Sequence, residues 1–184
     1  KKEIDWFYQE GASNIYPDDW EYFLEPIPEN EQGNLVAAYY KRLTSLDKSI
    51  RIESAKAWSN WEARTSKLSP SENSLHHFED IKIAEAFARI ECHYFINGGF
   101  FENENWILEN VSKIRHLPTV IVQGRYDVVC PMVSAWDLHR EFPEADLEIV
   151  LDAGHSMTED GIAAKLVEYT NKFSLLEKSN LILS

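Results

Sequence analysis

Asp127 and His155 are of the residue types, and in the kind of position, that acid–base catalysis needs. Asp127 ends the segment 124–127 (Gly-Arg-Tyr-Asp) and His155 ends the segment 152–155 (Asp-Ala-Gly-His), each a few residues after a short apolar run. A carboxylate can hold one imidazole nitrogen so that the other accepts a proton from a nucleophile. Either residue alone would fit a turn or a structural role, but the pair, with a glycine close to each, favours catalysis.

Two apolar runs are expected to form the strands that deliver this pair. Residues 118–124 (Pro-Thr-Val-Ile-Val-Gln-Gly) are β-branched and bounded by Pro and Gly, and residues 147–151 (Leu-Glu-Ile-Val-Leu) predict a second strand. Helices are expected at 133–142 and 161–173, with a loose or helical tail after them. This alternation predicts parallel strands of an open sheet, in which functional groups gather beyond the carboxyl ends. Because two strands do not make a stable sheet alone, chain outside this sequence is expected to complete it.

The sequence pattern of the first part of the chain differs from that of the strand-containing part. It shows helical periodicity and few patterns typical of strands. Helices are expected to begin after four N-capping positions: Asp18 or Asp19, Asn34, Asp47 and Asp80. The sequence therefore predicts an all-helical cap domain over residues 1–115, followed by a portion of an α/β core over residues 116–184.

Two glutamates lie in aromatic settings within the helical region. Glu91 shares one face of the helix expected after Asp80 with four apolar side chains, Ala84, Phe87, Ala88 and Phe95. Glu62 comes one turn after Trp58 and directly beside Trp61. Glutamate is rarely buried without a partner. One such residue could equally be salt-bridged and point to solvent, but two within one helical region favour a functional role.

Several segments of the chain resemble the proline iminopeptidases, which are serine peptidases of the α/β-hydrolase superfamily. The similar segments are residues 6–13 (WFYQEGAS), 58–62 (WSNWE), 86–95 (AFARIECHYF), 120–131 (VIVQGRYDVVCP), 134–138 (SAWDL) and 153–156 (AGHS). The similarity extends from Ile4 to about Phe173. The Asp127 and His155 motifs alone would indicate only an α/β-hydrolase, and the segment 86–95 narrows the family.

The resemblance implies the C-terminal part of an α/β-hydrolase parallel sheet, preceded by the helical cap. It implies a triad in the chain order nucleophile, acid, histidine, with Asp127 as the acid and His155 as the base. It further implies that Glu62 and Glu91 bind the free amino end of a peptide, while Phe95 contacts its proline ring. The expected reaction is release of an N-terminal proline by an exopeptidase, with no metal or organic cofactor.

A serine nucleophile motif is missing from the sequence. No Gly-x-Ser-x-Gly occurs, and a His-Gly-Gly oxyanion motif is absent as well. Both belong to the N-terminal part of such a fold, and the chain begins at Lys1 rather than Met, as after an internal cut. The chain is therefore expected to be inactive alone and to need that N-terminal part as its partner. The alternatives are another capped α/β-hydrolase (an esterase or a broader aminopeptidase) and a non-catalytic fragment with a helical interaction surface.

Composition limits the partners further. The formal net charge of -13 and the pI of about 4.8 argue against nucleic acid or an anionic membrane as partner. No apolar run of membrane length and no signal peptide is apparent. Cys92 and Cys130 make no metal-type pair and favour free thiols in a reducing compartment, so a cytoplasmic location is expected.

Overall fold

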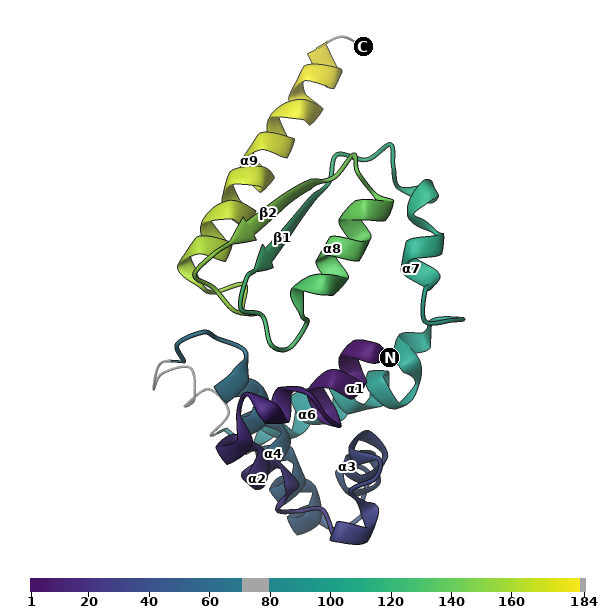
Figure 1. Ribbon diagram of the computed structural model, residues 1–184, viewed down its shortest axis with the longest axis vertical. Helices are drawn as coiled ribbons and strands as arrows, with labels where there is room; N and C mark the ends of the chain where they lie inside the picture. Colours follow the sequence, from purple (N-terminus) through teal and green to yellow (C-terminus); the bar gives the residue numbers. More distant parts are fainter. Residues whose placement is uncertain (71–79, 183–184) are drawn as a thin grey trace. The chain divides into compact units, whose positions relative to one another are not determined.

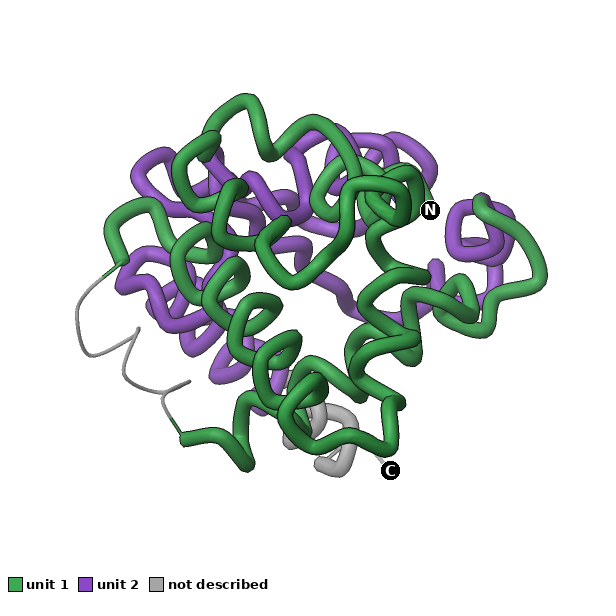
Figure 2. The backbone as a smooth tube through the Cα atoms, turned by 90° about the horizontal axis from the view of Figure 1, so that it is seen from below, with its two compact units in different colours: residues 1–104 green, residues 105–184 purple. Residues whose placement is uncertain are grey.

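The computed structural model describes residues 1–70 and 80–182, which belong to two compact units (Figure 2). The first unit is Lys1–Glu104 and the second is Asn105–Ser184. The compact units divide before residue 115 because Val111 packs against Phe142 and Ala145 of the second unit. The assignment of residues 1–115 to a cap and of 116–184 to a core stays a prediction.

Helices form the framework of the first unit (Figure 1). Its α-helices are α1 (Lys2–Tyr8), α2 (Pro17–Leu24), α3 (Leu35–Leu43), α4 (Lys48–Thr65) and α6 (Ile81–Ile96). Single 3-10 turns lie between or after them: η1 (Ala12–Asn14), η2 (Glu29–Glu31) and η4 (Gly98–Phe100).

Three of the helix starts expected in this unit are confirmed. The side chains of Asn34, Asp47 and Asp80 each accept a hydrogen bond from a backbone N–H in the first turn of α3, α4 and α6, respectively. The start expected after Asp18 or Asp19 is wrong, since α2 begins at Pro17. Proline suits the first helical position because its fixed φ is already helical and its missing N–H would have no partner there.

Aromatic rings from different helices make the core of the first unit. Six of them are no more than 2% exposed: Phe7, Tyr8, Phe23, Tyr39, Trp58 and Trp61. Tyr8 stacks on Trp58 with ring centroids 4.3 Å apart, and Phe23 stacks on Tyr39 at 4.6 Å. Since each ring buries a large apolar area, these contacts fix how α1, α2, α3 and α4 pack.

The second unit contains a parallel strand pair with one helix packed on each face (Figure 1). Its elements are α7 (Trp106–Glu109), η5 (Val111–Lys113), β1 (Val120–Gly124), α8 (Met132–Glu141), β2 (Asp146–Val150) and α9 (Asp160–Ile182). In the parallel register, Val120 lies opposite Asp146 and Gly124 lies opposite Val150. The order strand, helix, strand, helix is the one expected from the sequence.

Alternate side chains of β1 pack against helices on opposite faces of the strand pair. Ile121 packs with Leu138 of α8, whereas Val122 packs with Leu166 of α9. The helix α9 covers 23 residues and passes Phe173, where its end was expected. Among the described residues, neither α9 nor any other helix is long and apolar enough to cross a bilayer.

Candidate functional site

The ends of β1 and β2 bring Asp127 and His155 together. The Nδ1 atom of His155 lies 3.0 Å from Oδ2 of Asp127. Because Nδ1 faces the carboxylate, Nε2 is the ring nitrogen directed away from it. The Asp127 side chain is 5% exposed and the His155 side chain is 39% exposed. The acid is thus enclosed while the base remains accessible, which is what a general base that must reach a nucleophile requires.

The loops after the two strands approach each other so closely that residue 124 must be glycine. A Cβ atom on Gly124 would lie 1.8 Å from the carbonyl oxygen of Gly154. The backbone N–H of Tyr126 donates to the Ala153 carbonyl at 3.0 Å, which continues the pairing beyond the strand ends. These backbone contacts hold the loop of His155 against the loop of Asp127.

Asp127 also accepts hydrogen bonds from its own loop. The backbone N–H of Cys130 donates to Oδ1 at 2.8 Å, and the side-chain Nε2 of Gln123 donates to Oδ2 at 3.1 Å. No role for Gln123 was predicted from the sequence. The sequence feature that could have indicated a role for Gln123 is an amide side chain at the end of an apolar strand, one residue before Gly124.

In the first unit, Glu62 and Glu91 lie in one largely buried polar cluster. The Tyr8 hydroxyl donates a short hydrogen bond to Oε1 of Glu62 and lies 3.4 Å from Oε2 of Glu91. The indole Nε1 of Trp58 donates to that same Oε2 at 2.8 Å. Carboxylates from α4 and α6 thus meet on a phenol from α1. Tyr8 and Trp58 lie in the segments 6–13 and 58–62, but no role was predicted for them from the sequence, although buried Tyr and Trp need polar partners.

Burial governs the electrostatics of this cluster. Glu62 is 6% exposed, and its second oxygen accepts from the Ser66 hydroxyl at 3.4 Å. Burial raises the pKa of Glu62 well above its usual value, and the neighbouring Glu91 carboxylate raises it further. Burial and both carboxylates likewise raise the pKa of Tyr8. Two carboxylates so placed favour a proton or a bound cation. In the parts of the chain that the structure describes, no group of three or more His, Cys, Asp or Glu side chains is arranged to hold a metal ion.

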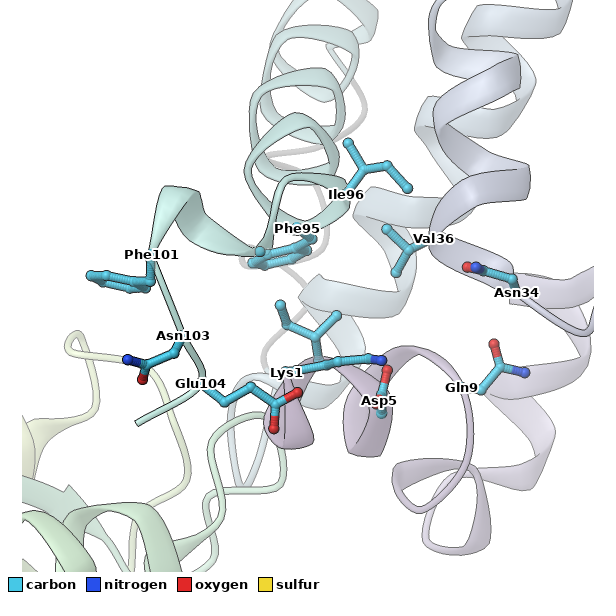
Figure 3. A pocket seen from close by; sticks show the side chains of 12 residues that line it. Lys1, Asp5, Gln9, Asn34, Val36, Phe95, Ile96, Phe101, Asn103 and Glu104 are labelled. Atoms are coloured by element: carbon cyan, nitrogen blue, oxygen red, sulfur yellow. The ribbon is translucent and has the colours of Figure 1, made fainter. Parts of the chain in front are cut away.

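Phe95 lies one turn after Glu91 and places its ring beside the same cluster. Its ring centroid is 5.2 Å from that of Tyr8 and 6.2 Å from that of Trp58. Phe95 also lines a cavity of about 360 Å³ in the first unit, to which Asp5 of α1 contributes as well (Figure 3). The ring of Phe95 thus lies beside the two aromatic side chains that donate hydrogen bonds to Glu62 and Glu91.

The sequence matches the family model described as "alpha/beta hydrolase fold" over residues 8–162. It is 57% identical over 180 residues to a probable proline iminopeptidase from Leptolyngbya boryana, an alignment covering 98% of this chain and 56% of that protein. It is 57% identical over 177 residues to the proline iminopeptidase of Arabidopsis thaliana, covering 96% and 47%, respectively. With the proline iminopeptidase of Xanthomonas citri it shares 51% over 172 residues, covering 94% and 55%. The chain spans about half the length of these curated relatives.

Proposed function

Because the chain belongs to the α/β-hydrolase fold family, we propose that Asp127 and His155 are the acid and base of a serine-hydrolase triad. The family model confirms the expected fold class, and the relatives confirm the resemblance to proline iminopeptidases. The observation that carries the proposal is the 3.0 Å contact between His155 Nδ1 and Asp127 Oδ2 beyond the ends of two parallel strands.

The reaction we infer is the release of an amino-terminal proline from a peptide. A serine hydroxyl attacks the prolyl carbonyl while His155 Nε2 takes its proton and then gives it to the leaving amine. Asp127 holds the Nδ1–H group and stabilises the imidazolium that forms. Water, activated in the same way by His155, then releases proline from the acyl-enzyme.

The serine of this mechanism comes from outside these 184 residues, because no Gly-x-Ser-x-Gly occurs in them. We infer that an N-terminal part of the fold supplies both the serine and the oxyanion hole, and that the 184 residues alone are inactive. Cys92 and Cys130 are not joined by a disulfide, and we infer a reducing compartment such as the cytoplasm.

Glu62 and Glu91 select the substrate in this proposal. A protonated proline amine that binds beside the two carboxylates supplies the positive charge that this buried pair favours, and Phe95 contacts the pyrrolidine ring. A peptide with a blocked amino end would leave the carboxylates buried without a cation, which opposes its binding. The selection for a free amine makes the enzyme an exopeptidase.

Chromogenic amides of proline, alanine and leucine test the proposal. A full-length protein that carries this sequence should hydrolyse the proline amide fastest, and His155→Ala should reduce its kcat by about 10⁴-fold or more. The 184 residues alone should show no hydrolysis. Equal rates on the three amides would reject the proline preference. Turnover by the 184 residues that is lost on His155→Ala would reject an external serine.

A further inference from the structure

Gln123 stands at the point where β1 passes into the loop of Asp127. It is the polar side chain of a strand that is otherwise Val120-Ile-Val and Gly124. Gln123 is two residues after Ile121, so it shares the strand face that Ile121 packs against α8. Its side chain is half-buried, and an amide in such a place is destabilising unless its N–H groups are paired.

Two hydrogen bonds set the orientation of the Gln123 amide. Its Nε2 atom lies 3.1 Å from Oδ2 of Asp127 and 3.0 Å from the carbonyl oxygen of Cys130, with a longer contact of 3.4 Å to the Gly124 carbonyl. All of these partners are acceptors at neutral pH, so the amide nitrogen rather than the amide oxygen must face them. Both amide hydrogens are therefore engaged by the loop that carries Asp127.

These contacts hold the Asp127 carboxylate at both oxygens. Gln123 binds Oδ2, and the backbone N–H of Cys130 binds Oδ1 at 2.8 Å. Because Gln123 also binds the Cys130 carbonyl, one amide connects the end of β1, the carboxylate and the residue two positions before α8. Rotation of the Asp127 carboxylate away from His155 would break both of its N–H contacts.

The same amide influences how the carboxylate acts on the imidazole. Oδ2 of Asp127 accepts from Gln123 and faces His155 Nδ1 at 3.0 Å, so the two donors share one oxygen. A hydrogen bond to a carboxylate stabilises its charge, and the charge is then less available to a second donor. Without the Gln123 amide, the negative charge of Asp127 stabilises the His155 imidazolium more strongly. A carboxylate at position 123 would add a second negative charge beside the imidazolium.

We propose that Gln123 is a positioning residue, which clamps the Asp127 carboxylate in line with His155 and moderates the proton affinity of the imidazole. The clamp itself is a property of these 184 residues, while its effect on turnover rests on the proposed function.

NMR titration of the His155 imidazole in a full-length protein that carries this sequence tests the clamp, and this measurement needs no turnover. Gln123→Met keeps the length of the side chain without its donors, and it should raise the pKa of His155. Gln123→Glu should raise that pKa more, by about one unit, because a second carboxylate then adjoins the pair. The control is Asn171→Asp, the same amide-to-acid change at an exposed position of α9, which should leave the pKa of His155 unchanged.

An unchanged pKa of His155 in both folded Gln123 variants would overturn the proposal. Hydrogen exchange of the wild-type side-chain amides keeps the test independent of how the variants fold. The Gln123 NH₂ group should exchange more slowly than that of exposed Asn171, and equal rates would also overturn the clamp.

Kinetics of the full-length protein add the catalytic readout. Gln123→Met should lower kcat for a proline amide about tenfold or more, leave KM within about twofold, and move the acid limb of the kcat/KM profile to higher pH. An unchanged kcat would reject the positioning role. If proline amides are not hydrolysed by the wild-type protein, the proposed function fails while the titration still decides the clamp.

Discussion

The two units of this chain place carboxylates in opposite ways. Asp127 faces an imidazole and accepts two N–H donors, so its negative charge is well supported. Glu62 instead meets Glu91 through the hydroxyl of Tyr8, in a buried place where the neighbouring charge has the same sign. A carboxylate of the first kind is suited to hold and orient a base, and a carboxylate of the second kind is suited to receive a cation.

The difference extends to stability. The donors around Asp127 offset its burial, whereas burial and Glu91 both favour the neutral form of Glu62, as its raised pKa indicates. A buried carboxylate pair of the second kind therefore lowers the stability of the fold at neutral pH, and binding of a cation raises it. Substitutions that act on one region and spare the other can separate these two designs.

Gly124→Ala should have the largest effect, since it disrupts the strand-end pair. The new Cβ would lie 1.8 Å from the Gly154 carbonyl oxygen, and this backbone oxygen can move away only if the loop of His155 moves. We expect a loss of about 3–5 kcal/mol in the free energy of unfolding. Urea denaturation, followed by signals from each unit, would measure the loss.

Gly33→Ala is the matched control for this change. A Cβ atom at Gly33 would meet nothing within 4 Å, so the free energy of unfolding should change by no more than about 0.5 kcal/mol. If Gly124→Ala were as mild as Gly33→Ala, the close approach of the two loops would not be what holds Asp127 and His155 together.

Tyr8→Phe should have the next largest effect, this time on the helical unit. The substitution keeps the ring stacked on Trp58 but removes the hydroxyl that donates to Glu62. A buried carboxyl group then loses its principal donor, and we expect a loss of about 2 kcal/mol. Thermal or urea unfolding measures it, and Tyr22→Phe is the control because Tyr22 is 65% exposed. Equal stability of the two variants would show that the Tyr8 hydroxyl does not support the glutamates.

The sequence predicted the strand-end pair well because the topology of parallel strands leaves little choice. Once the runs at 118–124 and 147–151 are strands of one sheet with a helix between them, their carboxyl ends lie at the same edge. The spatial proximity of Asp127 and His155 then follows from chain order. Local capping rules were similarly sufficient for the starts of α3, α4 and α6.

Contacts that depend on the packing of several helices were beyond such reasoning. Periodicity placed Glu91 on an inner face of α6, and aromatic neighbours marked Glu62, but neither pattern indicated that both would reach Tyr8. Tyr8 is far from either glutamate in sequence, and its position depends on the ring contacts among α1, α2 and α4. The hydrogen bonds of Gln123 could not be predicted for a different reason. The direction of one amide at a strand end depends on the exact path of the following loop.

Glu62→Gln should have the smallest effect and the opposite sign, because it removes the carboxylate that burial disfavours. The pKa of Glu62 is raised in the folded state, so the folded chain holds the proton of this carboxyl group more tightly than the unfolded chain does. The stability that Glu62 contributes is therefore fully present below about pH 4.3, the usual pKa of glutamate in an unfolded chain. It is lost as the pH rises through the pKa of the folded state. The variant should thus be more stable than wild type at pH 7, with the difference vanishing near pH 4. Urea unfolding across this pH range measures the difference.

Glu53→Gln, an exposed change on the same helix, should show no such trend. A Glu62→Gln chain that is less stable than wild type at pH 7 would mean that its charge is supported in the fold as that of Asp127 is, and the contrast between the two regions would fail.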